Sequence, residues 1–173
     1  EYYLSFDFKS LRDETKVQYQ YFLGVVLDTK VGDAQNLGSI NFADITTKMA
    51  KVSYEQWCER GIHLANHVMS VARVVYNYGI HMEHCTINPF SSIKRRTPIA
   101  RKVVWTQADV KAYLDVAYSD FYTRSLGLIV QMAYEWCQRL GDMRVIKWDN
   151  LDLLEQKMHI QQSKRRAEVF LPI

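Results

Sequence analysis

A segment near the middle of the chain, SSIKRRTPIARK at residues 91–102, divides the sequence into two parts. The segment has no apolar periodicity, and it follows Asn88-Pro89, where the proline ring disfavours a helical conformation at the preceding residue. Five of the 22 Lys and Arg residues of the chain fall between Lys94 and Lys102. We therefore expect a helical domain over residues 1–90, a basic extended linker over 91–103 and a second domain over 104–173.

The charge of the chain supports this division. The net charge of +3 is too small to indicate nucleic-acid binding by itself. Residues 1–93, however, carry 8 Lys/Arg and 10 Asp/Glu, whereas residues 94–173 carry 14 and 9. The excess of positive charge therefore begins at the linker.

Composition limits the class of protein. A chain of 173 residues that is 48% hydrophobic can bury a core. No apolar run approaches the roughly 18 residues that a membrane span needs. The 3 cysteines are far apart and contain no Cys-x-x-Cys pair, which argues against a disulfide framework or structural zinc. This pattern favours a reducing cytoplasm.

Upstream of the linker, the spacing of apolar residues predicts a small bundle of three or four helices. The clearest signal is a stripe with alternating spacings of four and three, which suits helix packing. The stripe consists of Leu64, Val68, Val71, Val75 and Tyr78. Two further helices are expected at residues 10–27 and 46–60, with a glycine-containing loop over 30–41 between them.

Downstream of the linker, the pattern predicts two helices and then short strands. Thr106 can cap the first helix, and Asp109 three positions later makes a variant of the capping box. The helices are expected over 106–118 and 123–138, and the strands near 150–153, 157–161 and 168–171. The chain is therefore expected to be mainly α, with a small antiparallel β-sheet near the C-terminus.

Two consecutive runs carry the residues that suggest chemistry, EWCQRLGDMRVIKWDNLD at 135–152 and MHIQQSKRRAEVFLPI at 158–173. Arg139 follows an apolar helix pattern, and Lys164 lies at a predicted turn between two strand-like runs. A guanidinium is permanently charged and can donate two parallel hydrogen bonds to phosphate oxygens. The pairing therefore points to phosphoryl transfer on DNA. Trp148, in the first run, is expected in the core.

The order of these features resembles the phage-integrase family of tyrosine recombinases over nearly the whole chain. That family has a Thr-Gly-x-Arg-x-x-Glu motif, then a Leu-x-Trp-x-Asp-Ile-Asp stretch and a lysine-bearing hairpin. The matching segments are Gln138–Asp142, Ile146–Asp152, Gln162-Ser163-Lys164 and Phe170-Leu171-Pro172, with Trp136-Cys137 in place of Thr-Gly. The resemblance implies a SAM-like helical core-binding domain and the first part of an α+β recombinase catalytic domain.

The resemblance also implies roles for individual residues. Arg139 would orient the scissile phosphate and offset transition-state charge, and Asp142 would hold that arginine in place. Lys164 resembles the family lysine that protonates the departing 5′ oxygen as a general acid. A tyrosine forms a 3′-phosphotyrosyl intermediate, so no cofactor and no metal are implied.

In the family, the His-x-x-Arg box, a further His or Trp and the tyrosine nucleophile lie downstream of the lysine hairpin. This sequence stops at Ile173, and none of its 11 tyrosines is in the corresponding place. We therefore expect a fragment that binds DNA and does not cleave it alone. A separate N-terminal arm-binding domain is a further expectation for the parent protein.

Double-stranded DNA is the expected partner, with the linker closing around the duplex between two lobes. The resemblance further implies a homotetramer on two duplexes, accessory DNA-bending proteins, no membrane, and a prokaryotic or phage-encoded, nucleoid-associated protein. The candidate DNA contacts are Lys94, Arg95, Arg96, Arg101 and Lys102 in the linker, Lys9, Arg12, Lys16 and Arg73 on helical faces, and Arg165 and Arg166 beside Lys164.

Simpler interpretations exist for the same residues. An arginine after an apolar helix, such as Arg139, can interact with the helix dipole alone. Asp142 can cap local backbone, and Lys164 can be an exposed turn lysine beside Arg165 or Arg166, either of which can be the real phosphate contact. The linker cations can belong to a solvated hinge.

Histidine spacing raises a metal site as another interpretation. His63 and His67 are spaced i, i+4, and His81-x-x-His84-Cys85 forms a second group. Zinc needs a closed set of ligands, and neither group has further ligands at a recognisable spacing. We therefore expect no metal. Two functional alternatives stay open: a non-catalytic DNA-binding protein derived from a recombinase, and a helical interaction domain with no nucleic-acid role.

Overall fold

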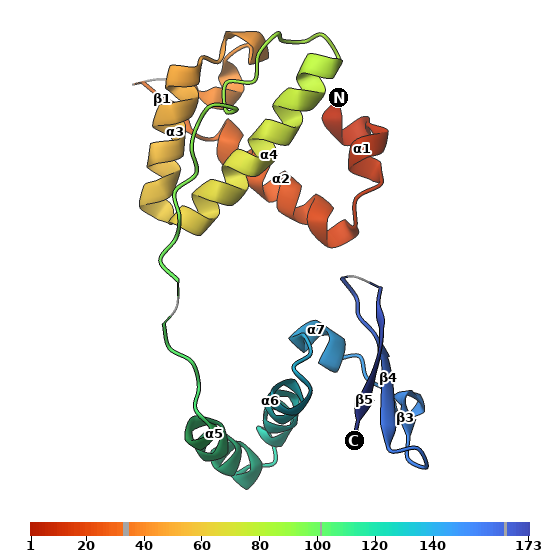
Figure 1. Cartoon of the computed structure of the whole chain (residues 1–173). Coiled ribbons are helices and arrows are strands. Elements are labelled where there is room, and N and C mark those ends of the chain that lie inside the picture. The colour runs from red at the N-terminus through yellow and green to blue at the C-terminus, as the bar shows by residue number, and fades with distance from the viewer. Residues whose placement is uncertain (33–34, 101, 165) are drawn as a thin grey trace. The chain divides into compact units, whose positions relative to one another are not determined.

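The computed structural model describes residues 1–32, 35–100, 102–164 and 166–173 (Figure 1). The chain forms two compact units, unit 1 over residues 1–100 and unit 2 over residues 101–173. The division falls inside the segment expected to be the linker. Helices dominate, and a three-stranded antiparallel sheet lies near the C-terminus, so the predicted fold class is confirmed. Among the helices of the described part, none is long and apolar enough to cross a membrane.

In its described residues, unit 1 contains helices and a short antiparallel strand pair, followed by an irregular segment after residue 81. Its long helix α4 packs against both α2 and α3 (Figure 1). The elements are η1 (Tyr2–Leu4), α1 (Phe6–Lys9), α2 (Asp13–Leu27), β1 (Lys30–Val31), β2 (Gln35–Asn36), η2 (Leu37–Ser39), η3 (Phe42–Asp44), α3 (Thr47–Arg60) and α4 (Ile62–His81). The antiparallel pair β1–β2 lies in the segment expected to be a loop.

Local signals explain where these helices begin and end. The Thr46 hydroxyl accepts a hydrogen bond from the backbone N–H of Met49 at 3.3 Å and so caps α3. Gly61 has φ +141°, a conformation that side-chain-bearing residues rarely adopt, and it ends α3 and starts α4. The helix predicted over residues 10–27 begins at Asp13, because the backbone of Arg12 is extended, and the short helix α1 lies before the predicted range.

The core of unit 1 is centred on Trp57, which is 1% exposed. Its indole Nε1 donates to the Thr29 hydroxyl at 2.8 Å, and its ring stacks on Phe90 with the centroids 6.0 Å apart. From the predicted apolar stripe of α4, Val68 and Val71 are buried. Phe90 and Ile93 are buried as well, so the chain beyond α4 packs onto unit 1 as far as Ile93.

Unit 2 consists of helices followed by the sheet. Strand β4 pairs with β3 on one side and with β5 on the other, and Met158 lies opposite both Leu151 and Leu171. The elements are α5 (Gln107–Ser119), α6 (Arg124–Trp136), α7 (Leu140–Met143), η4 (Trp148–Asn150), β3 (Leu151–Asp152), β4 (Lys157–Gln161) and β5 (Glu168–Pro172).

The predicted capping box at the start of α5 is confirmed. The Thr106 hydroxyl accepts from the N–H of Asp109, and the Asp109 carboxylate accepts from the N–H of Thr106 at 2.8 Å. These hydrogen bonds from Thr106 hold the pKa of the Asp109 carboxyl below its usual value.

The core of unit 2 is small. Its buried centre is Met143, Met158 and Ile160, with partly buried apolar side chains around them. The prediction that Trp148 lies in the core is wrong, because its side chain is 84% exposed. Ile146 and Leu151, on either side of η4, contact the core instead, and the 3₁₀ turn between them leaves the indole outside.

Candidate nucleic-acid interface

The end of α6 sets the position of the arginine segment. Cys137 has φ 50° and ψ 30°, a left-handed conformation that normally favours glycine. It occupies the position where the resembling motif carries glycine. The turn stops the helix at Trp136, before the predicted end at Gln138, and Arg139 then becomes the residue before α7.

Replacing Cys137 with glycine is expected to stabilise unit 2. The change removes a Cβ from a left-handed residue, which is worth about 1 kcal/mol in the free energy of unfolding. Urea denaturation followed by circular dichroism and tryptophan fluorescence measures the change. Cys137→Ala is the matched control, because it removes the sulfur and keeps the Cβ. Equal effects of glycine and alanine would contradict the backbone explanation.

Side chains join the arginine segment to the β4–β5 hairpin. The Arg139 guanidinium Nη1 lies 3.5 Å from Oε1 of Gln162, the long limit for a hydrogen bond, and 3.8 Å from Oδ2 of Asp142. Asp142 Oδ1 accepts from the backbone N–H of Ser163 at 2.9 Å. Gln162 Nε2 donates to Oε1 of Gln138 at 2.7 Å. We call these five residues the arginine cluster.

The two charged members of the arginine cluster differ in solvent exposure. The Asp142 side chain is 1% exposed, whereas that of Arg139 is 45% exposed. Hydrogen bonds from Ser163 hold the pKa of the Asp142 carboxyl below its usual value, the positive charge of Arg139 lowers it further, and burial opposes both. Within the described residues, Asp142 Oδ2 accepts no hydrogen bond and faces Arg139 as an ion pair. A buried anion thus restrains a guanidinium that solvent or an anionic ligand can still reach.

Lys164 lies in the turn of the hairpin that the sequence predicted. Its side chain is exposed, and it directly follows Ser163, whose N–H is bonded to Asp142. The hairpin therefore brings the backbone of Lys164 to the arginine cluster. Arg166, also exposed, has φ 54° at the far side of the turn. The predicted contacts Arg165 and Arg101 lie outside the described residues.

The other predicted DNA contacts fall into two groups. Lys94, Arg95, Arg96, Lys102, Lys9 and Arg12 are exposed, and Lys16 forms an ion pair with Asp13 at 3.0 Å. We call Lys94, Arg95 and Arg96 the basic segment. Arg73 is engaged differently, because its guanidinium donates to the backbone carbonyls of Phe90, Ser91 and Ile93. In the structure, the hydrogen-bond partners of the Arg73 guanidinium are therefore backbone carbonyls. A contact between Arg73 and DNA stays a prediction.

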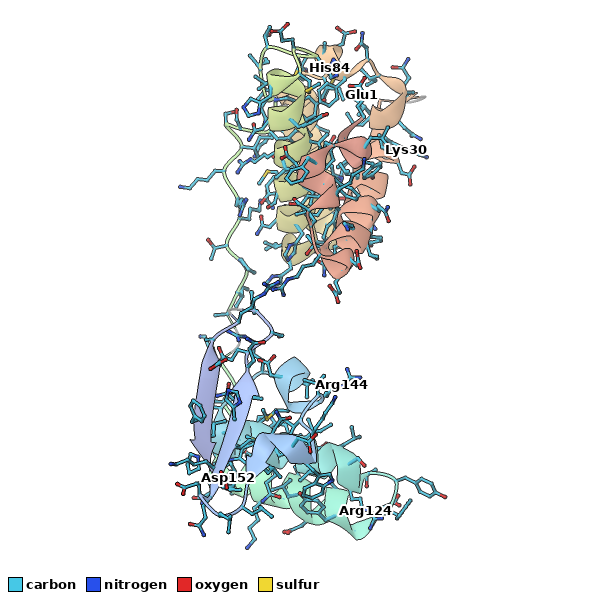
Figure 2. The ribbon with its side chains drawn as sticks, turned by 90° about the vertical axis from the view of Figure 1, so that its right-hand side faces the viewer. Glu1, Lys30, His84, Arg124, Arg144 and Asp152 are labelled. Atoms are coloured by element: carbon cyan, nitrogen blue, oxygen red, sulfur yellow. The ribbon has the colours of Figure 1, made fainter. Side chains whose placement is uncertain are left out.

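Other contacts engage two of the histidines considered for metal binding. His67 stacks on Phe22 with the ring centroids 5.5 Å apart. His84 pairs with Glu1, and Figure 2 shows the two side by side in unit 1. Within the described residues, no group of three or more potential metal ligands occurs.

Sequence reasoning missed several polar residues. Gln138 directly precedes Arg139, and Gln162 lies two residues before Lys164. Their places in these motifs could have marked them as members of the site. Tyr54 and Asn66, which bond to the backbone of Arg96, come from two different helices far away in the sequence. No local pattern marks that pair.

Comparison with known proteins links the chain to integrases through structure. No protein-family profile matches the chain. No curated protein matches its sequence. A lambda integrase dimer bound to a COC′ core site shares 20% identity with a TM-score of 0.77, and the match covers 95% of this chain and 44% of that one.

Two further solved structures give similar matches to this chain. A lambda integrase tetramer bound to a Holliday junction also gives 20% identity and a TM-score of 0.77, with 95% of this chain and 46% of that chain covered. The Tn1549 transposon integrase in complex with circular intermediate DNA gives 14% identity and a TM-score of 0.70, with 94% and 54% covered. The chain spans about half the length of these proteins. It therefore has the fold of the corresponding part of these integrases, as the resemblance predicted.

Proposed function

We propose that the chain is the DNA-binding part of a site-specific tyrosine recombinase, which cuts and rejoins DNA through a 3′-phosphotyrosyl intermediate. The observation that carries the proposal is the arginine cluster. Arg139 and the start of the lysine hairpin are far apart in the sequence, yet Gln162 and Ser163 contact the arginine segment directly. The fold shared with DNA-bound integrases supports the same function.

The chemistry follows from the exposure of the two cations. The half-exposed Arg139 guanidinium is available to bind two phosphate oxygens while Asp142 limits its motion. Lys164, on the exposed turn, serves as the general acid that protonates the 5′ oxygen. The proposal places the His-x-x-Arg box and the tyrosine nucleophile after residue 173. This chain by itself is therefore expected to bind duplex DNA without cleaving it.

Assembly is part of the same proposal. A solved lambda integrase forms a tetramer on a Holliday junction. By analogy, we propose a homotetramer on two duplexes for the protein that contains this chain, with accessory DNA-bending proteins as further partners.

Replacing Lys94, Arg95 and Arg96 together with alanine is expected to weaken duplex binding and flatten its salt dependence. Each cation that neutralises a phosphate contributes about 0.9 to the slope of log K against log salt. Loss of three such contacts lowers the slope by about 2 to 3. Fluorescence anisotropy titrations with a labelled duplex, between about 50 and 200 mM salt, measure this slope.

The matched control removes the same charge elsewhere in unit 1, by changing the exposed Lys30, Lys48 and Lys51 to alanine. This control is expected to leave most of the slope in place. Equal slopes for the two triple variants would show that net charge, rather than the basic segment, drives binding. A wild-type chain that binds no duplex even at low salt would favour the helical interaction domain instead.

One observation favours the non-catalytic alternative. Cys137 holds a left-handed conformation at the turn that positions Arg139, where the resembling motif has glycine. A recombinase derivative that binds its site without cutting can tolerate such a change. The two functions are separated by the parent reading frame, because a downstream His-x-x-Arg box and tyrosine belong only to the enzyme.

A further inference from the structure

We propose that Tyr54, Asn66 and Arg73 hold the basic segment as a rigid edge, so that its cations are positioned for DNA phosphates before binding. This inference rests on the proposed function and concerns the same surface. The sequence suggested a linker that closes around the duplex, whereas this inference gives residues 94–96 a fixed position on unit 1 before DNA binds. The chain here runs without helix or strand (Figure 1), so its backbone groups need other partners.

Both backbone polar groups of Arg96 have side-chain partners. Its N–H donates to the Tyr54 hydroxyl at 2.7 Å, and its carbonyl accepts from Asn66 Nδ2 at 2.9 Å. The Tyr54 hydroxyl donates to Asn66 Oδ1 at 2.8 Å, which closes a ring of three hydrogen bonds. An exposed, extended residue normally bonds to water, so this ring is a specific attachment.

The attachment is anchored in the core. Tyr54 lies on α3 and is 0% exposed, so packing fixes the ring and with it the direction of the hydroxyl. Asn66 lies on α4, the helix that packs against α3. Arg96 is therefore bonded to two packed helices.

A second anchor fixes the other end of the basic segment. Arg73 Nε donates to the Phe90 carbonyl at 2.9 Å, and its Nη2 donates to the carbonyls of Ser91 and Ile93. Phe90 and Ile93 are buried. Lys94 and Arg95 thus lie between a fixed residue before them and a fixed residue after them.

The positive charges of Arg73 and the basic segment suit a ligand that carries many negative charges. Burial lowers the pKa of the Arg73 guanidinium, and the nearby positive charge of Arg95 lowers it further. Among the described residues, neither Arg73 nor any residue of the basic segment forms an ion pair. Like charges held together without counterions attract a ligand with several negative charges, such as a duplex backbone.

Rigidity then affects affinity separately from charge. A preordered backbone loses little conformational entropy on binding, whereas a loose one must be ordered by the ligand. Releasing Arg96 should weaken binding without removing any cation. The salt slope, which counts neutralised phosphates, should stay the same.

The test compares Tyr54→Phe and Asn66→Ala with wild type in the anisotropy titration. Each variant is expected to bind the duplex about tenfold more weakly at every salt concentration, with an unchanged slope. Amide hydrogen exchange at Arg96 is expected to accelerate in both. Tyr76→Phe is the matched control, because Tyr76 is a buried tyrosine of unit 1 whose hydroxyl donates to the Phe42 carbonyl at 3.1 Å.

The outcomes separate the inference from the proposed function. A wild-type chain that binds, together with Tyr54→Phe and Asn66→Ala that bind equally well, overturns the inference alone. An equal loss in Tyr76→Phe also overturns it, because the effect is then one of general stability. A wild-type chain that does not bind duplex DNA overturns the proposed function and this inference with it. Asn66, which is only partly buried, provides a variant whose folding depends less on the core.

Discussion

Trp57→Ala is expected to lower the free energy of unfolding of unit 1 by about 4 kcal/mol. The side chain is 1% exposed, so its removal leaves a cavity rather than a solvated surface. It also removes the stacking against Phe90 and the hydrogen bond to the buried hydroxyl of Thr29. Urea denaturation followed by circular dichroism measures the loss.

The chain offers a matched control in its other tryptophans. Trp148→Ala makes the same chemical change at a side chain that is 84% exposed, and it is expected to change stability by less than about 0.5 kcal/mol. Because the carbonyl of Phe90 is one of those that Arg73 holds, Trp57→Ala should also speed amide exchange near Ile93. A loss below about 1 kcal/mol for Trp57→Ala would contradict the core described here.

Features that depend on nearby residues were predictable from the sequence. The capping box needs only Thr106 and Asp109, three positions apart, and it forms as expected. The β4–β5 hairpin needs alternating apolar residues on each side of a turn, and its strands lie within one residue of the predicted bounds. The boundary between the two units falls inside residues 91–103, the segment without apolar periodicity.

Features that depend on distant residues were not predictable in the same way. The hydroxyl of Tyr54 and the N–H of Arg96 are 42 residues apart in sequence, and the side chains of Gln138 and Gln162 are 24 apart. No periodicity encodes such pairs. Trp148 shows the opposite error, because a large apolar residue in a motif was assumed to be buried, and the 3₁₀ turn around it leaves it exposed.

Asp142→Ala is expected to lower the free energy of unfolding of unit 2 by about 2 kcal/mol at neutral pH, since a hydrogen bond to a charged group is worth about that much. The change removes the acceptor for the N–H of Ser163 and the anionic partner of Arg139. The hairpin that carries Lys164 should therefore loosen, and its amide exchange should accelerate. Asp142→Asn keeps an oxygen for Ser163 and removes only the charge, so a smaller loss is expected.

The pH dependence identifies the carboxylate as the source of this stability. The pKa of Asp142 is lower in the folded chain than its usual value of 3.8. Unfolding therefore raises its affinity for protons, and its contribution is fully present above about pH 4 and is lost as the pH falls through the folded value. The difference in the free energy of unfolding between wild type and Asp142→Asn should therefore become smaller as the pH falls below about 4. Asp115→Asn, at an exposed position of α5, is the control and should show no such narrowing. A difference for Asp142→Asn that stays constant down to about pH 2 would show that the charge of this carboxylate does not stabilise the fold.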